Sequence, residues 1–444
     1  MKGAEILIAS SPADADISCW NLRSGEELQR YKSCFSPPHG LATVAGLFLA
    51  SSQLRDSKRS SSGSIFYWSW NKVESRSILA EPVGPLVSNS EGTYIAGGGV
   101  SGDIYLWEVA TGKLLKKWHA HYRAVTCLVF NDDQSLLISG AEDGCVRVWS
   151  LFLVLDDVRR EEARSLYEHS FHEHSLKVTD VKTGHGGCDA IIVSSSEDRT
   201  CKVWSLYEGK LLRDIFFPSI IDAIVLGPRE TEFYAGGRDG KIHIVELNSP
   251  GTLNSSPDIL TEHSKAVTCL ASSADGFLLV SGSEDGKIRV WDTRTRNLVR
   301  GFRHTKGPVN NILVIRQSQS VFSQISKKPG TPKGHSFVLP PPLQKYASTP
   351  EENAYVEVYL SPHDNSDFDS QYISVQTMEN QIKELERQGS SVASEVELER
   401  LRSEQQRSAR MAQHWESLNK KLHQFCAEEI VYGSLTDVAK SPEI

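Results

Sequence analysis

The residues best able to do chemistry in this chain are paired carboxylates and a glycine run. Glu142-Asp143 and Glu284-Asp285 are of the types that general acid–base catalysis uses. Both pairs, however, occupy the same place in a repeated pattern and precede a glycine, which is typical of a tight turn. Gly97-Gly98-Gly99 lacks the Gly-Lys-Ser/Thr that completes a phosphate-binding loop. We therefore do not interpret any of them as a catalytic set.

Four histidines, His169, His172, His174 and His185, lie close together in the sequence and make a metal site conceivable. No cysteine joins them at a ligand spacing, and His174 belongs to the repeat described below. The chain also contains no nucleophile elbow and no His-Glu-x-x-His motif. We therefore predict no catalytic residue, no metal and no cofactor, and expect that the protein is not an enzyme.

The composition is that of a globular chain, with 39% apolar and 23% charged residues among 444. The net charge is −8, and residues 351–370 alone contribute −6, from six acids and no Lys or Arg. Because the remainder is close to neutral, we expect RNA contact to be at most indirect or weak. The eight cysteines follow no metal-ligand spacing, which favours reduced core residues of an intracellular protein. No apolar run approaches the ~18 residues of a membrane span.

The elements that must position the polar residues come from a repeat. The stretch 263–292 (HSKAVTCLASSADGFLLVSGSEDGKIRVWD) is typical of three short strands separated by turns. The stretch 121–149 (HYRAVTCLVFNDDQSLLISGAEDGCVRVW) is nearly a copy, and its first His and last Trp have the same spacing (291 − 263 = 149 − 121 = 28). Short strands repeated in this way predict an array of small sheets.

Strand-ending aromatic residues mark the other copies. They are Trp20, Trp68, Trp107, Trp149, Trp204 and Trp291, with Val245 in the corresponding place of the sixth copy. The intervals are 48, 39, 42, 55, 41 and 46 residues, around the ~40–45 residues of one propeller blade. Seven copies predict an all-β, seven-bladed β-propeller closed into a ring. The pattern resembles the WD40 repeat.

Three copies contain a set that resembles the buried Trp, Ser, His and Asp tetrad of WD40 blades. A buried indole N–H needs an acceptor, and a complete network fixes how the strands of a blade pack, so we interpret the set as structural. The second, third and sixth copies lack parts of it, which predicts looser blades. The residues are His121, Ser139, Asp143 and Trp149 in the fourth copy, His174, Ser194, Asp198 and Trp204 in the fifth, and His263, Ser281, Asp285 and Trp291 in the seventh.

The ends of the ring are predicted to meet in one sheet. The first copy starts at Glu5 directly on its second strand, so its innermost strand is missing. Residues 304–315 (HTKGPVNNILVI) are similar to the opening of a repeat with no repeat behind it. We predict that a strand at 309–315 fills the gap and closes the propeller, residues 1–317. His304 would then complete the polar set of Ser10, Asp14 and Trp20.

Three segments are expected after the ring. Residues 318–370 are a Pro-, Ser- and acid-rich linker, whose run at 339–343 (LPPPL) should be polyproline II that either braces the ring or docks on a partner. Residues 371–428 are predicted to be helical, and residues 429–444 are a tail. Within the ring, residues 151–171 lengthen the fourth interval and predict a short helix that projects from one face.

Apolar residues of the helical segment recur at alternating steps of three and four, the pattern of a helix that packs on another helix. They are Val375, Met378, Ile382, Leu385, Trp415, Leu418, Leu422 and Phe425. Self-association or partner binding through a short coiled coil is one interpretation, and packing on the chain's own ring is the other.

Three stretches carry a more specific resemblance. They are the N-terminal MKGAEILIASSPADADISCWNLRSG, the run LPPPLQKY at 339–346, and KKLHQFCAEEIVYG at the end of the helical segment. With them the chain resembles the WD-repeat subunit of the rixosome, the complex that matures the large ribosomal subunit. Plant members of that family carry the name Root Initiation Defective.

This resemblance implies a non-catalytic scaffold subunit in the nucleus, both nucleolus and nucleoplasm, that assists internal-spacer removal from pre-rRNA and 60S maturation. The implied partners are two helical-repeat subunits of the rixosome, a midasin-type ATPase and the pre-60S particle. The resemblance also implies a homodimer through the C-terminal helix, no membrane association and, in plants, consequences for root and meristem development.

A different function is indicated by residues 291–294 (WDTR), which match the WDxR box of substrate receptors for cullin-type ubiquitin ligases. Asp and Arg after the Trp are also common residues of the repeat, and one blade alone has the box. A cullin adaptor that is lost from the protein on Arg294→Ala would favour this alternative.

Overall fold

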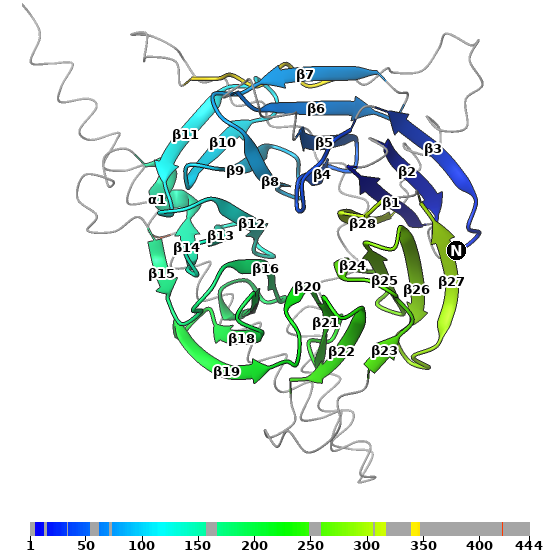
Figure 1. Ribbon diagram of the computed structural model, residues 1–444. Helices are drawn as coiled ribbons and strands as arrows, with labels where there is room; N and C mark the ends of the chain where they lie inside the picture. Colours follow the sequence, from blue (N-terminus) through cyan, green and yellow to red (C-terminus); the bar gives the residue numbers. More distant parts are fainter. Residues whose placement is uncertain are drawn as a thin grey trace, which may run out of the picture. The chain divides into compact units, whose positions relative to one another are not determined.

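Seven four-stranded antiparallel sheets, arranged as the blades of a ring, form the computed structural model (Figure 1). The structure describes residues 5–12, 16–32, 34–53, 62–70, 73–156, 167–247, 259–304, 307–316, 339–346 and 420. The predicted seven-bladed propeller is therefore confirmed. Among the described residues, the elements other than strands are the short helix α1 (Leu151–Leu155), the 3-10 helix η1 (Gly187–Asp189) and a single helical position, Lys420.

The blades follow one another along the chain, and the strands of each blade are ordered from the centre of the ring outward. Blade 1 consists of β28 (Asn311–Arg316), β1 (Glu5–Ser11), β2 (Asp16–Asn21) and β3 (Glu27–Lys32). Blade 2 consists of β4 (Leu41–Val44), β5 (Phe48–Gln53), β6 (Ser64–Ser69) and β7 (Glu74–Ile78). Blade 3 consists of β8 (Val83–Ser88), β9 (Tyr94–Gly99), β10 (Asp103–Glu108) and β11 (Leu114–His119). Blade 4 consists of β12 (Val125–Phe130), β13 (Leu136–Ala141), β14 (Val146–Ser150) and β15 (Tyr167–Phe171). Blade 5 consists of β16 (Val178–Thr183), β17 (Ile191–Ser196), β18 (Thr200–Ser205) and β19 (Lys210–Phe216). Blade 6 consists of β20 (Ile221–Leu226), β21 (Glu232–Gly237), β22 (Lys241–Glu246) and β23 (Ile259–Thr261). Blade 7 consists of β24 (Val267–Ser272), β25 (Leu278–Ser283), β26 (Lys287–Asp292) and β27 (Leu298–Arg303).

The core is divided among the contacts between blades. Strands such as β1, β5 and β13 are buried at every position, because a neighbouring blade covers each face of their sheet. Each pair of neighbouring blades shares one cluster of buried apolar side chains, as between blades 7 and 1 (Leu7, Val280 and Ile312, among others). Apolar residues on both faces of a short strand therefore fit a propeller, in which no blade buries its own surface alone.

The innermost strand of blade 1 comes from the other end of the ring. β28 pairs antiparallel with β1, from Glu5 opposite Arg316 to Ser10 opposite Asn311. Figure 1 shows these two strands side by side, one from the start of the chain and one from the end of the repeats. The strand expected at 309–315 thus begins two residues later, and the ring is closed within one sheet by backbone hydrogen bonds.

The insertion in blade 4 differs from its prediction. Its helix α1 does not project, because Leu151 and Val154 are buried against the cluster between blades 3 and 4. These residues are three positions apart, so they share one face of the helix, and that face packs on the ring. The charged centre of the insertion, residues 157–166, lies outside the described residues.

The segments after the ring are described in part. Residues 339–346 pack on the propeller, where they contact blades 2 and 3. Of the predicted helical segment the structure describes Lys420 alone, so all eight residues from Val375 to Phe425 in the three–four pattern lie outside the described residues. Within the described residues, no helix has both the length and the hydropathy needed to cross a membrane.

Candidate functional site

The structure brings together each of the three complete polar sets. In blade 4, Trp149 Nε1 lies 2.8 Å from Ser139 Oγ, which lies 2.7 Å from His121 Nε2. His121 Nδ1 lies 3.2 Å from Asp143 Oδ2. Blade 5 repeats these three distances with Trp204, Ser194, His174 and Asp198 at 2.9, 2.8 and 3.0 Å. Blade 7 repeats them with Trp291, Ser281, His263 and Asp285 at 2.8, 2.8 and 3.2 Å.

With a neutral histidine, the hydrogen bonds of the set in blade 4 run in one direction. The indole N–H donates to the serine oxygen, so the serine hydroxyl proton is free to donate to His Nε2. Nε2 then accepts, which places the single proton of a neutral imidazole on Nδ1. Nδ1–H donates to the aspartate, as the distance of 3.2 Å from His121 Nδ1 to Asp143 permits. The set of blade 4 is therefore satisfied with a neutral histidine and an ionised aspartate. In blade 7 the Arg289 guanidinium also donates to His263 Nδ1.

The electrostatics of the sets agree with this assignment. Burial lowers the pKa of His121 and of His263, although the neighbouring aspartates act in the opposite direction. Burial alone would raise the pKa of Asp143, but hydrogen bonds from His121 and from the backbone amides of Cys145 and Tyr122 hold that pKa well below its usual range.

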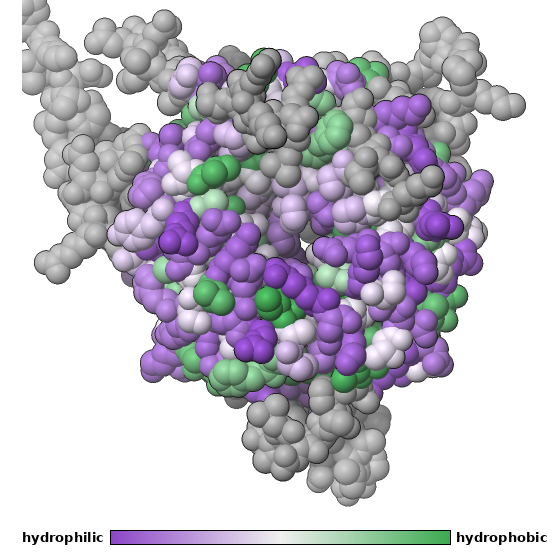
Figure 2. Space-filling model, viewed as in Figure 1, coloured by the Kyte–Doolittle hydropathy of each residue, from purple (hydrophilic) through white to green (hydrophobic). Residues whose placement is uncertain are grey.

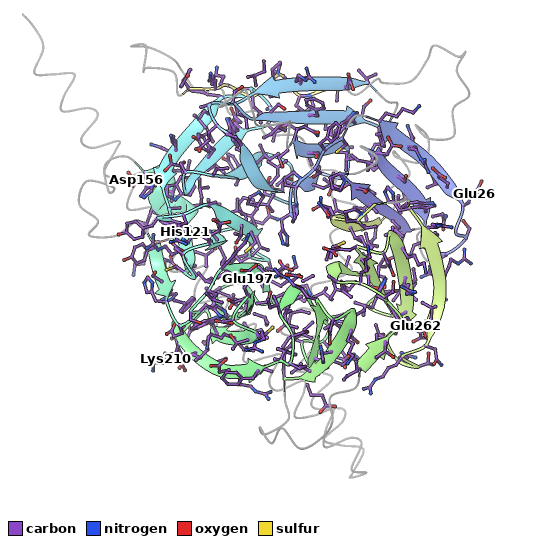
Figure 3. All side chains as sticks on the ribbon, in the orientation of Figure 1. Glu26, His121, Asp156, Glu197, Lys210 and Glu262 are labelled. Carbon is purple, nitrogen blue, oxygen red and sulfur yellow. The ribbon has the colours of Figure 1, made fainter. Side chains whose placement is uncertain are left out.

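A serine, a histidine and an aspartate in hydrogen-bonded order also form the triad of hydrolases, but these sets cannot work as one. Ser139, Ser194 and Ser281 are each 0% exposed. A substrate carbonyl must reach the serine oxygen, and here the indole N–H already occupies that oxygen. The sets hold the strands of a blade together, and Figure 3 shows His121 inside blade 4 rather than at the central opening.

Lowering the pH from 7 to 5 should destabilise the ring. Because the pKa values of His121 and His263 are lowered in the folded chain, the unfolded chain binds protons below pH ~6.5 that the folded chain does not. Their contribution is complete above pH ~6.5 and falls by up to about 1.4 kcal/mol per pH unit per histidine until the folded pKa is reached. Urea unfolding at pH 7, 6 and 5 measures this slope. His121→Gln should flatten it; equal slopes in the parent chain and His121→Gln would contradict the assignment.

Blade 1 corrects one predicted residue. The serine lies ten positions before the Trp in the complete sets, which predicts Ser10 for Trp20. In the structure, however, Trp20 pairs with Leu7, thirteen positions back, whereas Trp149 pairs with Leu137, twelve positions back. The turn between β1 and β2 is thus one residue longer, and Ala9 takes the place of the serine.

The prediction that Ser10 joins His304 is therefore wrong. His304 Nε2 donates to the carbonyl oxygen of Ala9 at 2.9 Å, and its ring lies edge-on to Trp20 with centroids 5.4 Å apart. Ser10 Oγ instead accepts from Asn311 Nδ2 at 3.0 Å. Asp14, the fourth predicted member, lies outside the described residues.

The other incomplete blades use different residues, which the sequence reasoning missed. In blade 2, Ser51 has the register of the tetrad serine, two positions after the partner of Trp68, and its Oγ lies 3.4 Å from Cys34 Sγ. The Ser-rich insertion that the sequence shows at 55–62 lengthens the spacing from Ser51 to Trp68, so the spacing of the complete sets does not find this serine. In blade 6, Phe217 precedes β20 as His121 precedes β12, and Val245 replaces the Trp, so apolar packing takes the place of the polar set.

The four histidines considered for a metal do not meet. His174 belongs to the set of blade 5, and His169 stacks on Phe171 with centroids 6.1 Å apart. His172 Nδ1 lies 2.9 Å from Cys145 Sγ, and His185 Nδ1 lies 3.6 Å from Asp132. In the part of the chain that the structure describes, no three His, Cys, Asp or Glu side chains are grouped to hold a metal ion.

The centre of the ring holds a cavity of about 270 Å³ lined by all seven innermost strands. Asp180, 2% exposed, is its main charged group. Its carboxylate accepts from Lys182 Nζ at 3.1 Å and from the backbone N–H of Ile224 at 3.0 Å. His39, from the loop before β4, donates from Nε2 to the carbonyl oxygen of Thr179 on the opposite side of the ring at 3.1 Å. Asp180, Lys182 and His39 are thus bonded to groups of the ring rather than directed at a ligand.

Comparison with known proteins identifies the family. The model of the WD domain, G-beta repeat, matches residues 112–150, 166–205 and 254–292, which include the β-strands of the three complete sets. Over 436 residues the chain is 49% identical to Protein ROOT INITIATION DEFECTIVE 3 of Arabidopsis thaliana, covering 96% of this chain and 98% of that protein. The chain belongs to the Root Initiation Defective family of WD40 proteins.

Relatives of this family occur outside plants. WD repeat-containing protein 18 of Homo sapiens is 34% identical over 348 residues, which are 74% of this chain and 77% of that protein. Pre-rRNA-processing protein IPI3 of Yarrowia lipolytica is 29% identical over 314 residues, which are 67% of this chain and 72% of that protein. The Root Initiation Defective family is therefore related to a protein named for pre-rRNA processing.

The WDTR residues of this Root Initiation Defective family member have a local role. The Asp292 carboxylate accepts from the backbone N–H groups of Arg294 and Thr295, at 2.8 and 3.2 Å, and so shapes the turn after β26. The Arg294 guanidinium lies over the ring of Phe277, 4.4 Å from its centroid. In blade 1, Asn21 makes the same contact with the N–H of Arg23 at 3.0 Å. The box therefore fits the common turn chemistry of the repeat.

One face of the propeller carries exposed apolar side chains on three successive blades. Val100 is 57% exposed, Tyr122 81% and Leu176 53%. They lie in the loops that follow β9, β11 and β15, and all of these loops leave the blades at the same end. Figure 2 shows a largely hydrophilic surface with separate hydrophobic patches. Apolar side chains on the loops of a rigid ring are typical contacts for a protein partner.

Proposed function

We propose that this protein is a non-catalytic scaffold subunit of a nuclear complex for pre-rRNA processing and 60S subunit maturation. The observation that carries the proposal is similarity over nearly the whole length, 49% over 96% of the chain, within a family related to a pre-rRNA-processing protein. The described residues support a scaffold, because their polar sets are buried and internally bonded. Such a ring offers rigid loops rather than a reactive group.

The partners follow from the same family membership. We propose the helical-repeat subunits of the rixosome, a midasin-type ATPase and the pre-60S particle, with contact to RNA at most indirect. The exposed residues Val100, Tyr122 and Leu176 are the surface that we assign to one protein partner. Nucleolar and nucleoplasmic location follows from that assembly, as does an effect on root and meristem growth in plants.

Purification of the tagged full chain from cells tests the proposal. Pre-60S proteins should copurify, and depletion of the protein should raise the amount of pre-rRNA that retains its internal spacer. In the double variant Tyr122→Asp and Leu176→Asp, the amount of at least one copurified partner should fall about tenfold. Phe216→Asp is the matched control, because Phe216 is 64% exposed on the outer strand β19. Copurification of a cullin adaptor that Arg294→Ala removes, with no pre-60S protein, would contradict it.

Assembly through the C-terminal helix is a separate part of the proposal. Light scattering should give twice the chain mass for the full protein and one chain mass for a chain that ends at Ser370. The expected cause is burial of the apolar residues that recur every three or four positions, which one helix alone leaves exposed. A monomeric full chain would exclude the homodimer and would leave the helix for a different partner.

A further inference from the structure

Residues 339–346 (LPPPLQKY), which we call the strap, are bound to the ring at blades 2 and 3. Figure 1 shows them beside β7, as the yellow segment. The backbone N–H of Leu343 donates to Ser77 Oγ at 2.9 Å, and that of Gln344 donates to the carbonyl oxygen of Gly112 at 2.7 Å. In return, Trp107 Nε1 donates to the carbonyl oxygen of Gln344 at 3.0 Å. Three hydrogen bonds therefore fix two adjacent residues of the strap.

Apolar contacts surround these hydrogen bonds. Leu343 is 4% exposed and belongs to the cluster between blades 2 and 3, with Leu79, Trp107 and Val109. Leu339 packs against the same cluster from the other end of the proline run. The prolines between the two leucines have no N–H to satisfy and hold an extended backbone, so little conformational entropy is lost on binding. The strap thus has two apolar anchors joined by a stiff spacer.

The strap supplies a hydrogen-bond acceptor that blade 3 lacks. Leu79, four positions before β8, stands where His121 stands before β12. Gly97, two positions after the strand partner of Trp107, stands where the serine stands in blade 4. A Cβ on Gly97 would lie 3.1 Å from the Trp107 ring, so the indole packs directly on this glycine. The carbonyl oxygen of Gln344 accepts the N–H that no serine of blade 3 can accept.

We propose that the surface formed by Ser77, Trp107 and Gly112 is a recognition site for an extended Leu-Pro-Pro-Pro-Leu peptide, which this chain fills with its own residues 339–346. The site binds the peptide through a hydroxyl, a carbonyl oxygen and an indole N–H, and through the apolar cluster between blades 2 and 3 in which the second leucine is buried. It also holds Leu343 and Gln344 against blades 2 and 3.

A substitution on the ring tests the site without altering the strap. Gly112 has φ +70°, and a Cβ there would lie 2.5 Å from the carbonyl oxygen of Pro342. Gly25 occupies the same position of the turn in blade 1 and has φ +80°, and the three atoms nearest to a Cβ there belong to the flexible Arg300 side chain. Gly112→Ala and Gly25→Ala therefore strain equivalent turns, and Gly112→Ala alone pushes on the strap backbone.

Hydrogen exchange of the full chain is the readout. Protection of the Leu343 and Gln344 amides should fall at least tenfold in Gly112→Ala and stay within twofold of the parent chain in Gly25→Ala. Unchanged protection of the Leu343 and Gln344 amides in Gly112→Ala, or an equal loss of their protection in both variants, would overturn the assignment. Exchange in blade 5 serves as the internal reference for the folded ring.

Binding in trans separates a peptide site from a merely structural contact. The probe is a labelled synthetic peptide of residues 338–347, and the proteins are the full parent chain and full chains with Leu343→Asp or Leu343→Ala. The peptide should bind each substituted chain at least tenfold more tightly than the parent, in which the strap fills the site. A peptide that itself contains Leu343→Asp should not bind. Failure of the peptide to bind a folded variant whose strap exchanges freely would overturn the proposal.

Discussion

Deletion of residues 304–317 should abolish the folded ring. These residues supply β28, which makes six residue pairs with β1, and they bury Val309 and Ile312 against Leu7 and the rest of the cluster between blades 7 and 1. Burying each of these two side chains contributes about 1.5–3 kcal/mol, and opening the ring also exposes the cluster. The total loss approaches the 5–15 kcal/mol net stability of an ordinary domain. Tryptophan fluorescence in urea should therefore show no cooperative transition.

The control for this deletion is a chain that ends at Tyr346, which keeps every described strand and the strap. It should unfold cooperatively, with a midpoint close to that of the full protein. The point variant Ile312→Asp, which buries a charge at a position 6% exposed, should fall between the two. A deletion of 304–317 that still unfolds in one cooperative step would refute closure through β28.

Ser139→Ala should cost roughly 2–6 kcal/mol of unfolding free energy, a large effect for the loss of one hydroxyl. The change leaves the buried N–H of Trp149 without its acceptor and Nε2 of His121 without its donor. Each unsatisfied buried group costs about 1–3 kcal/mol. Urea unfolding at pH 7 measures the loss, and Ser194→Ala and Ser281→Ala should behave alike because their hydroxyls have the same two partners.

Ser10→Ala provides the matched comparison, since Ser10 is as buried as Ser139 and occupies the place that spacing alone predicts for blade 1. Its hydroxyl accepts from Asn311 Nδ2, and this amide also donates to Ser36 Oγ at 3.2 Å and to the carbonyl oxygen of Pro37 at 2.8 Å. We expect a cost of about 1 kcal/mol. Equal losses of unfolding free energy for Ser10→Ala and Ser139→Ala would mean that the tetrad network stabilises the ring no more than another buried hydroxyl does.

The fold could be predicted from the sequence because the same pattern of strands and turns occurs several times in it. The near copies at 121–149 and 263–292 specify strand, turn and polar set together, so weaker copies could be aligned to them. The missing first strand and the extra one at 304–315 then defined the closure. Periodicity of this kind depends on side-chain types at fixed spacing, which a single sequence shows directly.

The errors and omissions have two physical causes. Turn length is not fixed by the strands that a turn joins, and one extra residue between β1 and β2 moved the tetrad position from Ser10 to Ala9. Contacts between distant segments leave no periodic signal, so the partner of Trp107 could not be read from the sequence, although it lies in the conspicuous proline run. Of the two roles expected for that run, its position in the structure selects the first, because it braces the ring.

The pairing of β28 with β1 sets the order of events when the protein is made. Ile6 pairs with Ile315, so 309 positions separate two residues that share one sheet (315 − 6 = 309). During synthesis from the N-terminus, the inner edge of β1 stays unpaired until β28, the last strand of the ring, has been made. An exposed edge with Ile6, Leu7 and Ile8 is a template for misassembly, and contacts of such long range form slowly. The interval between the first and last strands is thus the period in which the nascent chain most needs protection from aggregation.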